Sequence, residues 1–414
     1  MAAARTVRGT RDLLPDDSRR LRSVEDAAWQ TARRFGYGEI ATPIFEFTEV
    51  FARTLGDTSD VVTKEMYTFN DRGGDSLTLR PENTAGIVRA FISNSLAAQL
   101  PQRIFYRGPM FRYERPQKGR LRQFHQVGVE LLGAADPLAD VEVISLAHEF
   151  LCALGLAGAI TLELNTLGSS DARAAYRSRL VDYLEAHRER LSPDSLERLE
   201  RNPLRILDSK DAGDRAVIAE APMLADSLDE ASRDFFAAVR AGLDELGIPH
   251  QINPRLVRGL DYYCHTTFEF TTEHLGAQGT VLAGGRYDGL VAQMGGPPTP
   301  GTGWAAGVER LMMLSGGPAA ASRPVAMIAL GREQAGAALR LARRLRQAGH
   351  TVPFAFGSSL GKQMKWANRI GARLAVIVGT EEVAREVATV RDMDAGAQEQ
   401  VALDLLEERL AQSA

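Results

Sequence analysis

Apolar residues recur along this chain with two different spacings. Between residues 17 and 35 they lie three or four positions apart, which predicts an amphipathic helix. Between residues 124 and 130 apolar and polar side chains alternate, which predicts a β-strand. The same criteria predict further strands at 39–47, 66–70, 76–80, 104–106, 161–167, 267–273 and 280–282, and helices at 84–100, 137–154 and 304–314.

The pattern changes twice more along the chain. Residues 170–245 are densely charged with helical spacing, and Pro193 and Pro203 interrupt them, so we expect a small helical insertion. Beyond a linker that ends near residue 324, strands and helices alternate. This alternation predicts an α/β domain with a parallel or mixed sheet. Its predicted strands are 325–330, 351–356, 374–378 and 386–393, and its helices are 333–348, 362–370 and a final one.

Length and composition place the chain in a broad class. A chain of 414 residues can form two or three domains, and we expect one over 1–320, containing the insertion at about 170–245, and another over 325–414. Cys152 and Cys264 form no CxxC pair, which favours a reducing compartment. We find no apolar signal-peptide core and no run long enough to cross a bilayer, so we expect a cytoplasmic protein without a membrane partner.

The densest charge lies on a predicted hairpin. Residues 103–122 contain seven Arg or Lys and one acid, Glu114. Like charges at this density repel unless anions neutralise them, which favours an anion site over a solvated basic turn. Gln126 and Glu130 lie on one face of the following strand, where a sheet usually places apolar residues. They favour the floor of a pocket for a polar ligand.

The chain lacks the usual phosphate-binding loops. Neither a Walker A sequence nor GxGxxG after a strand occurs, so bound phosphates would be held by arginine side chains, whose planar guanidinium fits phosphate. The candidates are Arg112, Arg258 and Arg310. Two of them have a structural alternative, since Arg310 could pair with Glu309, and Arg258 with Asp261.

A second cluster combines glycines with tyrosines. Paired glycines before Tyr287 allow a ligand to approach the backbone closely, and Tyr263 follows another tyrosine. Packing in a core is the alternative for each tyrosine. Glu82 precedes a predicted helix, so it either caps that helix or pairs with the ammonium group of a ligand.

Five segments together resemble a known family. TLRPENTAGIVRAF, FYRGPMFRYERPQKGRLRQFHQVGVELLG, RLVRGLDYYCHTTFEF, AGGRYDGLV and GTGWAAGVERLMML occur in the order found in bacterial histidyl-tRNA synthetases. The resemblance implies an α+β catalytic domain of the class II synthetase type with a mainly antiparallel sheet, and a C-terminal α/β anticodon-binding domain. The region around Pro43 resembles the dimer contact of the family, which implies a homodimer. Asn83 departs from the glycine that many relatives have there.

The resemblance also implies a reaction and its site. ATP and histidine would form histidyl-adenylate and pyrophosphate, with Mg²⁺ bridging the phosphates, and the histidyl group would pass to the 3′ end of its tRNA. Arg258 and Arg112 would be catalytic, and no protein ligand of the metal is assigned. The histidine-binding residues would be Glu82, Thr84, Gln126, Glu130, Arg258, Tyr263 and Tyr287. The ATP-binding residues would be Arg112, Glu114, Arg120, Phe124 and Arg310, and Gln117 would contact the tRNA acceptor end.

Three rival classes remain to be compared. A synthetase-like regulatory subunit of histidine biosynthesis would typically lack the anticodon domain and erode the histidine motifs, both of which this sequence retains. Another class II synthetase would not share LVRGLDYY and AGGRYDGL. A pure RNA-binding module would leave Glu130, Tyr287 and Arg258 without a role. Enzyme and binding protein are distinguished by amino-acid-dependent exchange of pyrophosphate with ATP.

Overall fold

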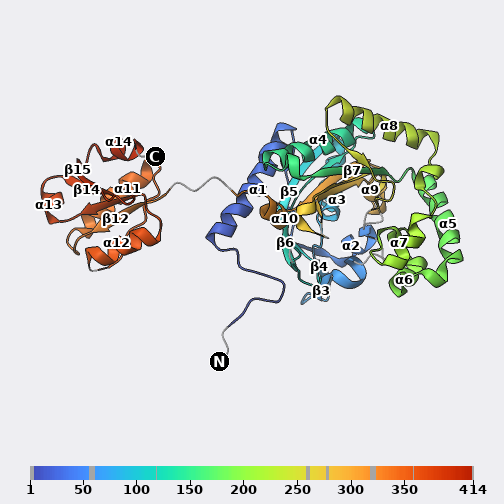
Figure 1. Cartoon of the computed structure of the whole chain (residues 1–414), viewed down its shortest axis with the longest axis horizontal. Coiled ribbons are helices and arrows are strands. Elements are labelled where there is room, and N and C mark those ends of the chain that lie inside the picture. Colours follow the sequence, from blue (N-terminus) through green and yellow to red (C-terminus); the bar gives the residue numbers. More distant parts are fainter. Residues whose placement is uncertain are drawn as a thin grey trace. The chain divides into compact units, whose positions relative to one another are not determined.

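The computed structural model describes residues 4–55, 61–117, 119–257, 262–276, 279–317, 323–357 and 359–412. The chain divides into two compact units, Met1–Gly317 and Pro318–Ala414, each with its own sheet and core (Figure 1). In the part of the chain just delimited, we find no helix with the length and apolar character needed to cross a membrane.

An eight-stranded sheet forms the centre of the first unit, with strand order β1-β5-β6-β11-β10-β9-β7-β8. Its neighbours pair antiparallel except β1 with β5 and β7 with β8, which are parallel. The mainly antiparallel sheet predicted for this fold class is confirmed. The strands are β1 Gly38–Glu39, β5 Gln102–Phe111, β6 Gln123–Leu132, β7 Thr161–Thr166, β8 Gln251–Ile252, β9 Cys264–Thr271, β10 Thr280–Arg286 and β11 Gly301–Gly307.

The basic hairpin is the longest pairing in this sheet. β5 and β6 pair from Gln102 with Leu132 to Phe111 with Gln123. The strands extend well beyond the predicted 104–106 and 124–130, because each residue added to the ladder satisfies further backbone groups. Alternation along β6 places Val127 and Val129 in one core, while Gln126, Gly128 and Glu130 face the other side of the sheet.

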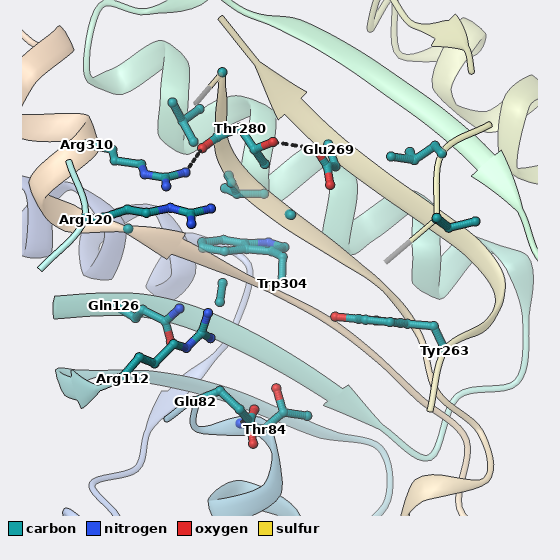
Figure 2. Close-up of a pocket in the computed structure, with 18 of the residues that line it drawn as sticks. Glu82, Thr84, Arg112, Arg120, Gln126, Tyr263, Glu269, Thr280, Trp304 and Arg310 are labelled. Carbon is teal, nitrogen blue, oxygen red and sulfur yellow. Dashed lines mark hydrogen bonds between the residues drawn. The ribbon is translucent and has the colours of Figure 1, made fainter. Parts of the chain in front are cut away.

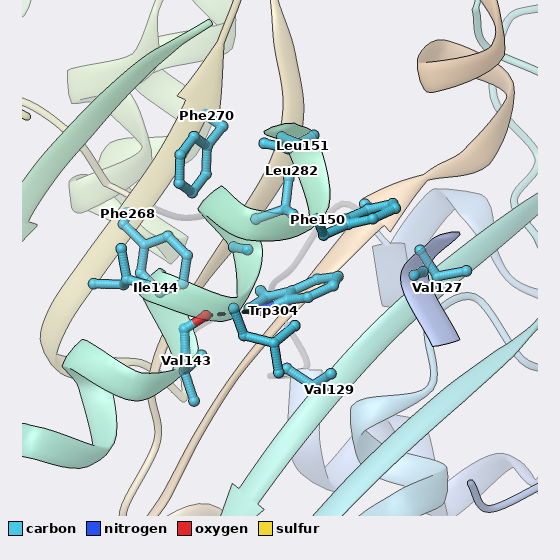
Figure 3. Close-up of a cluster of buried hydrophobic side chains, with 14 of the residues drawn as sticks. Val127, Val129, Val143, Ile144, Phe150, Leu151, Phe268, Phe270, Leu282 and Trp304 are labelled. Carbon is cyan, nitrogen blue, oxygen red and sulfur yellow. Dashed lines mark hydrogen bonds between the residues drawn. The ribbon is translucent and has the colours of Figure 1, made fainter. Parts of the chain in front are cut away.

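Helices cover one face of this sheet. Figure 3 shows the apolar cluster beneath α4, in which the Phe150 and Trp304 rings stack with centroids 5.8 Å apart. The indole N–H of Trp304 donates to the carbonyl of Val143 at 3.0 Å, so the buried ring leaves no polar atom unpaired. Asp136 caps α4, and Pro137 begins it, as predicted. The covering helices are α1 Pro15–Arg34, α4 Pro137–Ala153, α8 Glu230–Glu245 and α10 Val308–Leu314.

Two predicted elements of this unit are wrong. Trp304 was expected on a helix over 304–314, yet β11 runs to Gly307 and the helix begins at Val308. β11 pairs on both sides, with β6 and β10, and this tertiary pairing outweighs local helical spacing. The strand expected over 39–47 is two strands in different sheets, with Pro43 between them, because proline cannot donate to a ladder.

A second, three-stranded sheet has the order β2-β4-β3. It consists of β2 Phe45–Phe47, β3 Tyr67–Asn70 and β4 Ser76–Leu79, and it leaves Phe45, Phe47 and Phe69 about half exposed. The predicted helix over 84–100 ends early, at Ser93, and a 3₁₀ turn Leu96–Gln99 follows. The remaining helices near these strands are α2 Thr48–Leu55, α3 Thr84–Ser93 and α9 Leu290–Gln293.

Residues 170–245 form helices and short turns, with no strand. Figure 1 shows α5, α6 and α7 grouped at one side of the first unit, beside the strands rather than on the helix-covered face. Ser169, Ser192, Asp211 and Asp229 cap successive helices through their side-chain oxygens, which explains where each one begins. Three of these helices precede α8 in the chain. They are α5 Ser170–Ala186, α6 Pro193–Arg201 and α7 Ala212–Ala219.

The second unit is a smaller α/β structure with a mixed sheet, as predicted. β12 and β13 pair parallel, and β13, β14 and β15 pair antiparallel. The strand expected at 351–356 is a single bridge from Phe354 to Met327, and the polar edge strand β15 was not predicted. The elements are β12 Val325–Ala329, α11 Ala335–Gln347, α12 Leu360–Arg369, β13 Leu374–Val378, α13 Thr380–Ala384, β14 Val387–Asp392, β15 Gln398–Ala402 and α14 Leu406–Ala411.

Candidate active site

A cavity of about 710 Å³ lies on the face of the large sheet that α4 does not cover. Residues from β4–α3, the basic hairpin, β9, β10, β11 and α10 meet in it. Of the predicted site residues, those lining the cavity are Glu82, Thr84, Arg112, Glu114, Arg120, Phe124, Gln126, Glu130, Tyr263, Tyr287 and Arg310.

Two predicted residues remain. Arg258 lies outside the described residues, as does its alternative partner Asp261. Gln117 lies at the turn of the basic hairpin, where its backbone exchanges hydrogen bonds with that of Arg120.

Glu130 stands at the floor of one end of the cavity. Its side chain is 1% exposed, yet both carboxyl oxygens have a partner. The Thr84 hydroxyl donates to Oε1 at 2.7 Å, and the Tyr287 hydroxyl donates to Oε2. A buried carboxyl held from two sides is rigid, so it presents a fixed polar surface to a ligand.

Glycines on neighbouring strands make room for this carboxyl. A Cβ at Gly303 would lie 1.9 Å from the Glu130 Oε2 atom, so no other residue fits opposite Glu130. A Cβ at Gly128 would lie 2.4 Å from the Tyr106 hydroxyl. The polar floor of the cavity therefore depends on glycine at two positions in the middle of strands.

Three tyrosines form the wall beside Glu130. The rings of Tyr262 and Tyr263 lie 4.7 Å apart, and those of Tyr262 and Tyr287 lie 5.7 Å apart, edge to face. In Figure 2 the Tyr263 hydroxyl points into the cavity. The wall is thus flat and aromatic with polar tips, which suits a planar ligand that carries hydrogen-bonding atoms.

Glu82 caps helix α3 and lies at the same end of the cavity as Glu130. Its carboxylate accepts from the backbone N–H of Thr84 at 2.6 Å and of Ala85 at 3.0 Å, at the first turn of α3. The capping alternative raised from the sequence is therefore correct. Glu82 lines the cavity as well, and burial raises its pKa. Capping and ligand contact are compatible because a carboxylate has four acceptor positions.

Burial also raises the pKa of Glu130, from 4.5 to about 8, with the nearby Glu82 charge adding to the rise. The folded chain thus keeps a proton that the unfolded chain loses near pH 4.5. The free energy of unfolding should therefore fall as pH rises from about 4.5 to about 8, by about 1.4 kcal/mol per pH unit from this group.

Glu130→Gln should remove this contribution, because glutamine does not titrate. Urea unfolding at pH 5 and pH 7.5 should show the wild type losing about 3 kcal/mol more than the variant across that interval. Parallel pH profiles for the two proteins would mean that Glu130 is ionised in the folded chain at neutral pH.

The other end of the cavity gathers guanidinium groups. Figure 2 shows Arg112, Arg120 and Arg310 on the side away from Tyr263. Burial lowers the pKa of Arg310, and the charges of Arg120 and Arg112 lower it further, so the three cations lie close enough to repel one another. Such a cluster favours an anion with several charges between its members.

Backbone carbonyls hold two of these arginines in place. Arg112 Nε donates to the Pro81 carbonyl at 2.8 Å, and its guanidinium lies 5.4 Å from the centre of the Phe124 ring. Arg310 donates to the carbonyls of Gly119 at 3.3 Å and Thr280 at 2.5 Å. The cluster is therefore organised before any anion binds.

Two acids near the cluster have different partners. Glu114 pairs with Arg120 at 2.9 Å. Glu309, considered as the alternative partner of Arg310, instead accepts from the backbone N–H of His125 at 2.9 Å and lies 2.8 Å from the His125 Nδ1 atom. Its carboxylate thereby fastens α10 to β6.

Sequence reasoning missed several residues of the cavity. Glu163 and Glu269 face each other on β7 and β9, and both line it. A glutamate inside each apolar strand, TLELNTL and TTFEF, was the available signal. The insertion and the loop after β8 contribute further lining residues, among them Arg205, Leu207, Lys210, Asn253 and Arg255. No local pattern distinguishes these from other surface residues.

Arg286, in the AGGRYDGL segment, supports the fold instead. Its fully buried guanidinium pairs with Asp140 at 3.0 Å and with Asp288 at 3.0 Å. This ion pair ties the end of β10 to α4, next to Tyr287. Losing Arg286 would leave the buried Asp140 carboxylate without its ion-pair partner, which typically costs about 3–5 kcal/mol.

Comparison with known proteins identifies the family to which this chain belongs. The model of the histidyl-tRNA synthetase family matches residues 9–311, and the anticodon-binding domain model matches residues 324–413. The chain is 65% identical to the histidine–tRNA ligase of Rhodospirillum rubrum over 99% of each chain, and 55% identical to that of Gluconacetobacter diazotrophicus over 99% of each. The apo crystal structure of S. aureus histidyl-tRNA synthetase superposes with a TM-score of 0.82 at 34% identity, covering 98% of this chain and 99% of that one. The chain belongs to the histidyl-tRNA synthetase family.

Proposed function

We propose that this protein activates histidine with ATP and transfers it to the 3′ end of its tRNA. The observation that carries the proposal is a single cavity with two different ends. One end has a rigid buried carboxyl beside tyrosines, and the other has three guanidinium groups. The first suits an imidazole and the second a triphosphate.

Histidine would occupy the tyrosine end. Both ring nitrogens of imidazole seek partners, and Glu130, Tyr263 and Tyr287 offer them. Glu82 and Thr84 would receive the α-amino group. Gln126 would contact the histidine carboxylate through its amide NH₂ group, since a carboxylate only accepts hydrogen bonds. An amino acid that left these groups unpaired would be rejected by factors on the order of 10⁴.

ATP would occupy the arginine end. Arg112 would hold the α-phosphate, Arg310 and Arg120 the remaining phosphates or the adenine, and Phe124 would lie under the purine. Glu114 would keep Arg120 oriented through their ion pair. Arg258 is proposed as a second ligand of the α-phosphate, by family resemblance alone.

In the first step an oxygen of the histidine carboxylate attacks the α-phosphorus. The bond to the bridging oxygen breaks, and its electron pair leaves with pyrophosphate. The protein forms no covalent bond in this step. Its contribution is to hold the two reactants in line and to neutralise charge that develops on the phosphate, which preorganised arginines do well.

Mg²⁺ accompanies ATP in our proposal, and the cavity contains oxygen donors that fit it. The carboxylates of Glu163 and Glu269 lie opposite each other on adjacent strands, where Glu163 also accepts a hydrogen bond from Asn253 and Glu269 one from Thr280. These two residues would hold the ion, which screens the phosphate charges when bound.

The second unit would bind the tRNA. Residues 332–373 contain nine Arg or Lys against one acid, Glu333. Some of these arginines serve the fold, as Arg344 does in its pair with Glu407. Exposed Lys362, Lys365 and the end of α12 remain available, and α12 contains no acid. Gln117 is proposed to contact the acceptor end.

We also propose that the protein is a homodimer, joined through the three-stranded sheet. Phe45 and Phe47 on β2 are 48% and 52% exposed, and Phe69 on β3 is 45% exposed. Grouped aromatic side chains of this size on a sheet favour a protein contact.

Replacing Phe47 by aspartate should convert the dimer to a monomer, since a charge would be buried in an apolar contact. Sedimentation velocity measures the change. Leu246→Asp is the control, because Leu246 is 54% exposed just beyond α8 and far from this sheet in the sequence. Equal effects of the two substitutions, or none from Phe47→Asp, would place the contact elsewhere.

The regulatory-subunit alternative is disfavoured. Such a protein was expected to lack the anticodon domain and to lose the histidine motifs. Residues 324–413 match that domain, and the described residues that we propose to bind histidine line the cavity.

The test of the proposed function is ATP–pyrophosphate exchange with each standard amino acid in turn. We expect exchange with histidine alone. No exchange with any amino acid would favour a non-catalytic protein, and exchange with a different one would overturn the assignment of the tyrosine end.

A further inference from the structure

We infer that the helical insertion positions the histidine end of the cavity through two arginines, Arg173 and Arg255. This inference rests on the proposed function, because it assigns these residues to the binding of histidine. Both would be positioning residues, acting through Tyr263.

Arg255 joins the cavity wall to the end of α7. Its guanidinium donates to the carbonyls of Ala221 at 2.9 Å, Ala219 at 3.3 Å and Pro222 at 3.3 Å. The last carbonyls of a helix lack partners within it and carry partial negative charge, so a guanidinium there is held by hydrogen bonds and by charge.

Arg255 is anchored on the sheet side as well. Its backbone N–H donates to the side chain of Asn253 at 3.1 Å. The Asn253 amide in turn donates to Glu163 on β7 at 2.5 Å, and its backbone N–H donates to Leu164 at 2.9 Å. A continuous set of hydrogen bonds therefore runs from the large sheet, through Arg255, to α7.

Arg173 makes the second connection. It lies on α5, and its guanidinium donates to the backbone carbonyl of Tyr263. The hydroxyl of Tyr176, one turn further along α5, donates to the carbonyl of Pro222 at 3.1 Å, which also accepts from Arg255. The insertion thus contacts Tyr263 from α5 and Arg255 from α7, and the two helices contact each other where the Tyr183 hydroxyl donates to the Val217 carbonyl at 2.9 Å.

The position of Tyr263 depends on this arrangement. Its ring packs against Gly285, where a Cβ would lie 2.9 Å from the ring, and its hydroxyl points into the cavity (Figure 2). Freeing the Tyr263 carbonyl, or detaching Arg255 from α7, would let the insertion move relative to the sheet. Histidine binding should weaken, while the arginine cluster, built on the hairpin and α10, should keep its geometry.

The experiment measures ATP–pyrophosphate exchange for the full chain with Arg173→Ala and Arg255→Ala, determining KM for histidine and KM for ATP separately. We expect KM for histidine to rise about tenfold in each variant, with KM for ATP changed less than about twofold. Arg173→Lys should recover most of the loss, because lysine can still donate to a single carbonyl. Arg255→Lys should recover less, because three carbonyls share its planar guanidinium.

Arg188→Ala is the matched control. Arg188 belongs to the same insertion, and it pairs with Glu185 on the surface at 3.1 Å, so its loss should leave both KM values unchanged. Where an alanine variant unfolds, its lysine counterpart supplies the measurement.

The outcomes separate this inference from the proposed function. Absence of histidine-dependent exchange in the wild type would overturn the proposed function itself. Normal wild-type exchange, with KM for histidine unchanged in the Arg173 and Arg255 variants or rising together with KM for ATP, would overturn the positioning role alone.

Discussion

Arg112→Ala is expected to slow histidine-dependent pyrophosphate exchange by about 10²–10³-fold, the usual cost of removing one preorganised charge donor from a reacting centre. Arg112 is held by the Pro81 carbonyl and lies beside Phe124, so its guanidinium has a fixed direction in the cavity. The loss should fall mainly on kcat, because charge on the α-phosphate grows during the reaction. Steady-state exchange kinetics measure it.

Arg115→Ala is the control for this prediction. Arg115 is exposed on the same basic hairpin, and exchange of pyrophosphate requires no tRNA. Its loss should change the rate little. If the two substitutions have equal effects, the hairpin acts through its total charge and Arg112 has no special place in the reaction.

Glu130→Ala should abolish histidine activation, with a loss of up to about 10⁴-fold, while ATP still binds. The substitution removes the carboxyl that would meet the imidazole. It also leaves the hydroxyls of Thr84 and Tyr287 without their shared partner. Exchange kinetics measure the first effect, and calorimetric titration with ATP measures the second.

Glu130→Gln serves as the companion variant. It keeps the size of the side chain and one acceptor oxygen, so the fold should be retained and the loss should be smaller than with alanine. A normal exchange rate in Glu130→Ala would show that the imidazole binds elsewhere. Loss of ATP binding in both variants would instead mean that the two ends of the cavity are not independent.

The polar floor of the site could be predicted from the sequence because it depends on local order. Alternation along a strand places Gln126 and Glu130 on one face, and a dense run of arginines marks an anion site without knowledge of the fold. Both expectations concern neighbours along the chain. The structure places Gln126, Glu130 and Arg112 in one cavity.

Other features required contacts between distant segments. Glu163 faces Glu269 only because β7 and β9 pair, and Arg255 finds its carbonyls 33 to 36 residues earlier in the chain. Trp304 was expected on a helix because spacing alone does not reveal that β11 has a partner on each side. Local propensity cannot supply such pairings, and sequence reasoning therefore missed these residues or misplaced them.

The central claim is that histidine and ATP meet in one cavity. A crystal structure with a non-hydrolysable analogue of histidyl-adenylate tests it most directly. We expect the imidazole within hydrogen-bonding distance of Glu130 and Tyr263, with the phosphate mimic against Arg112. An analogue bound with its imidazole among the arginines, or seated outside this cavity, would contradict the account.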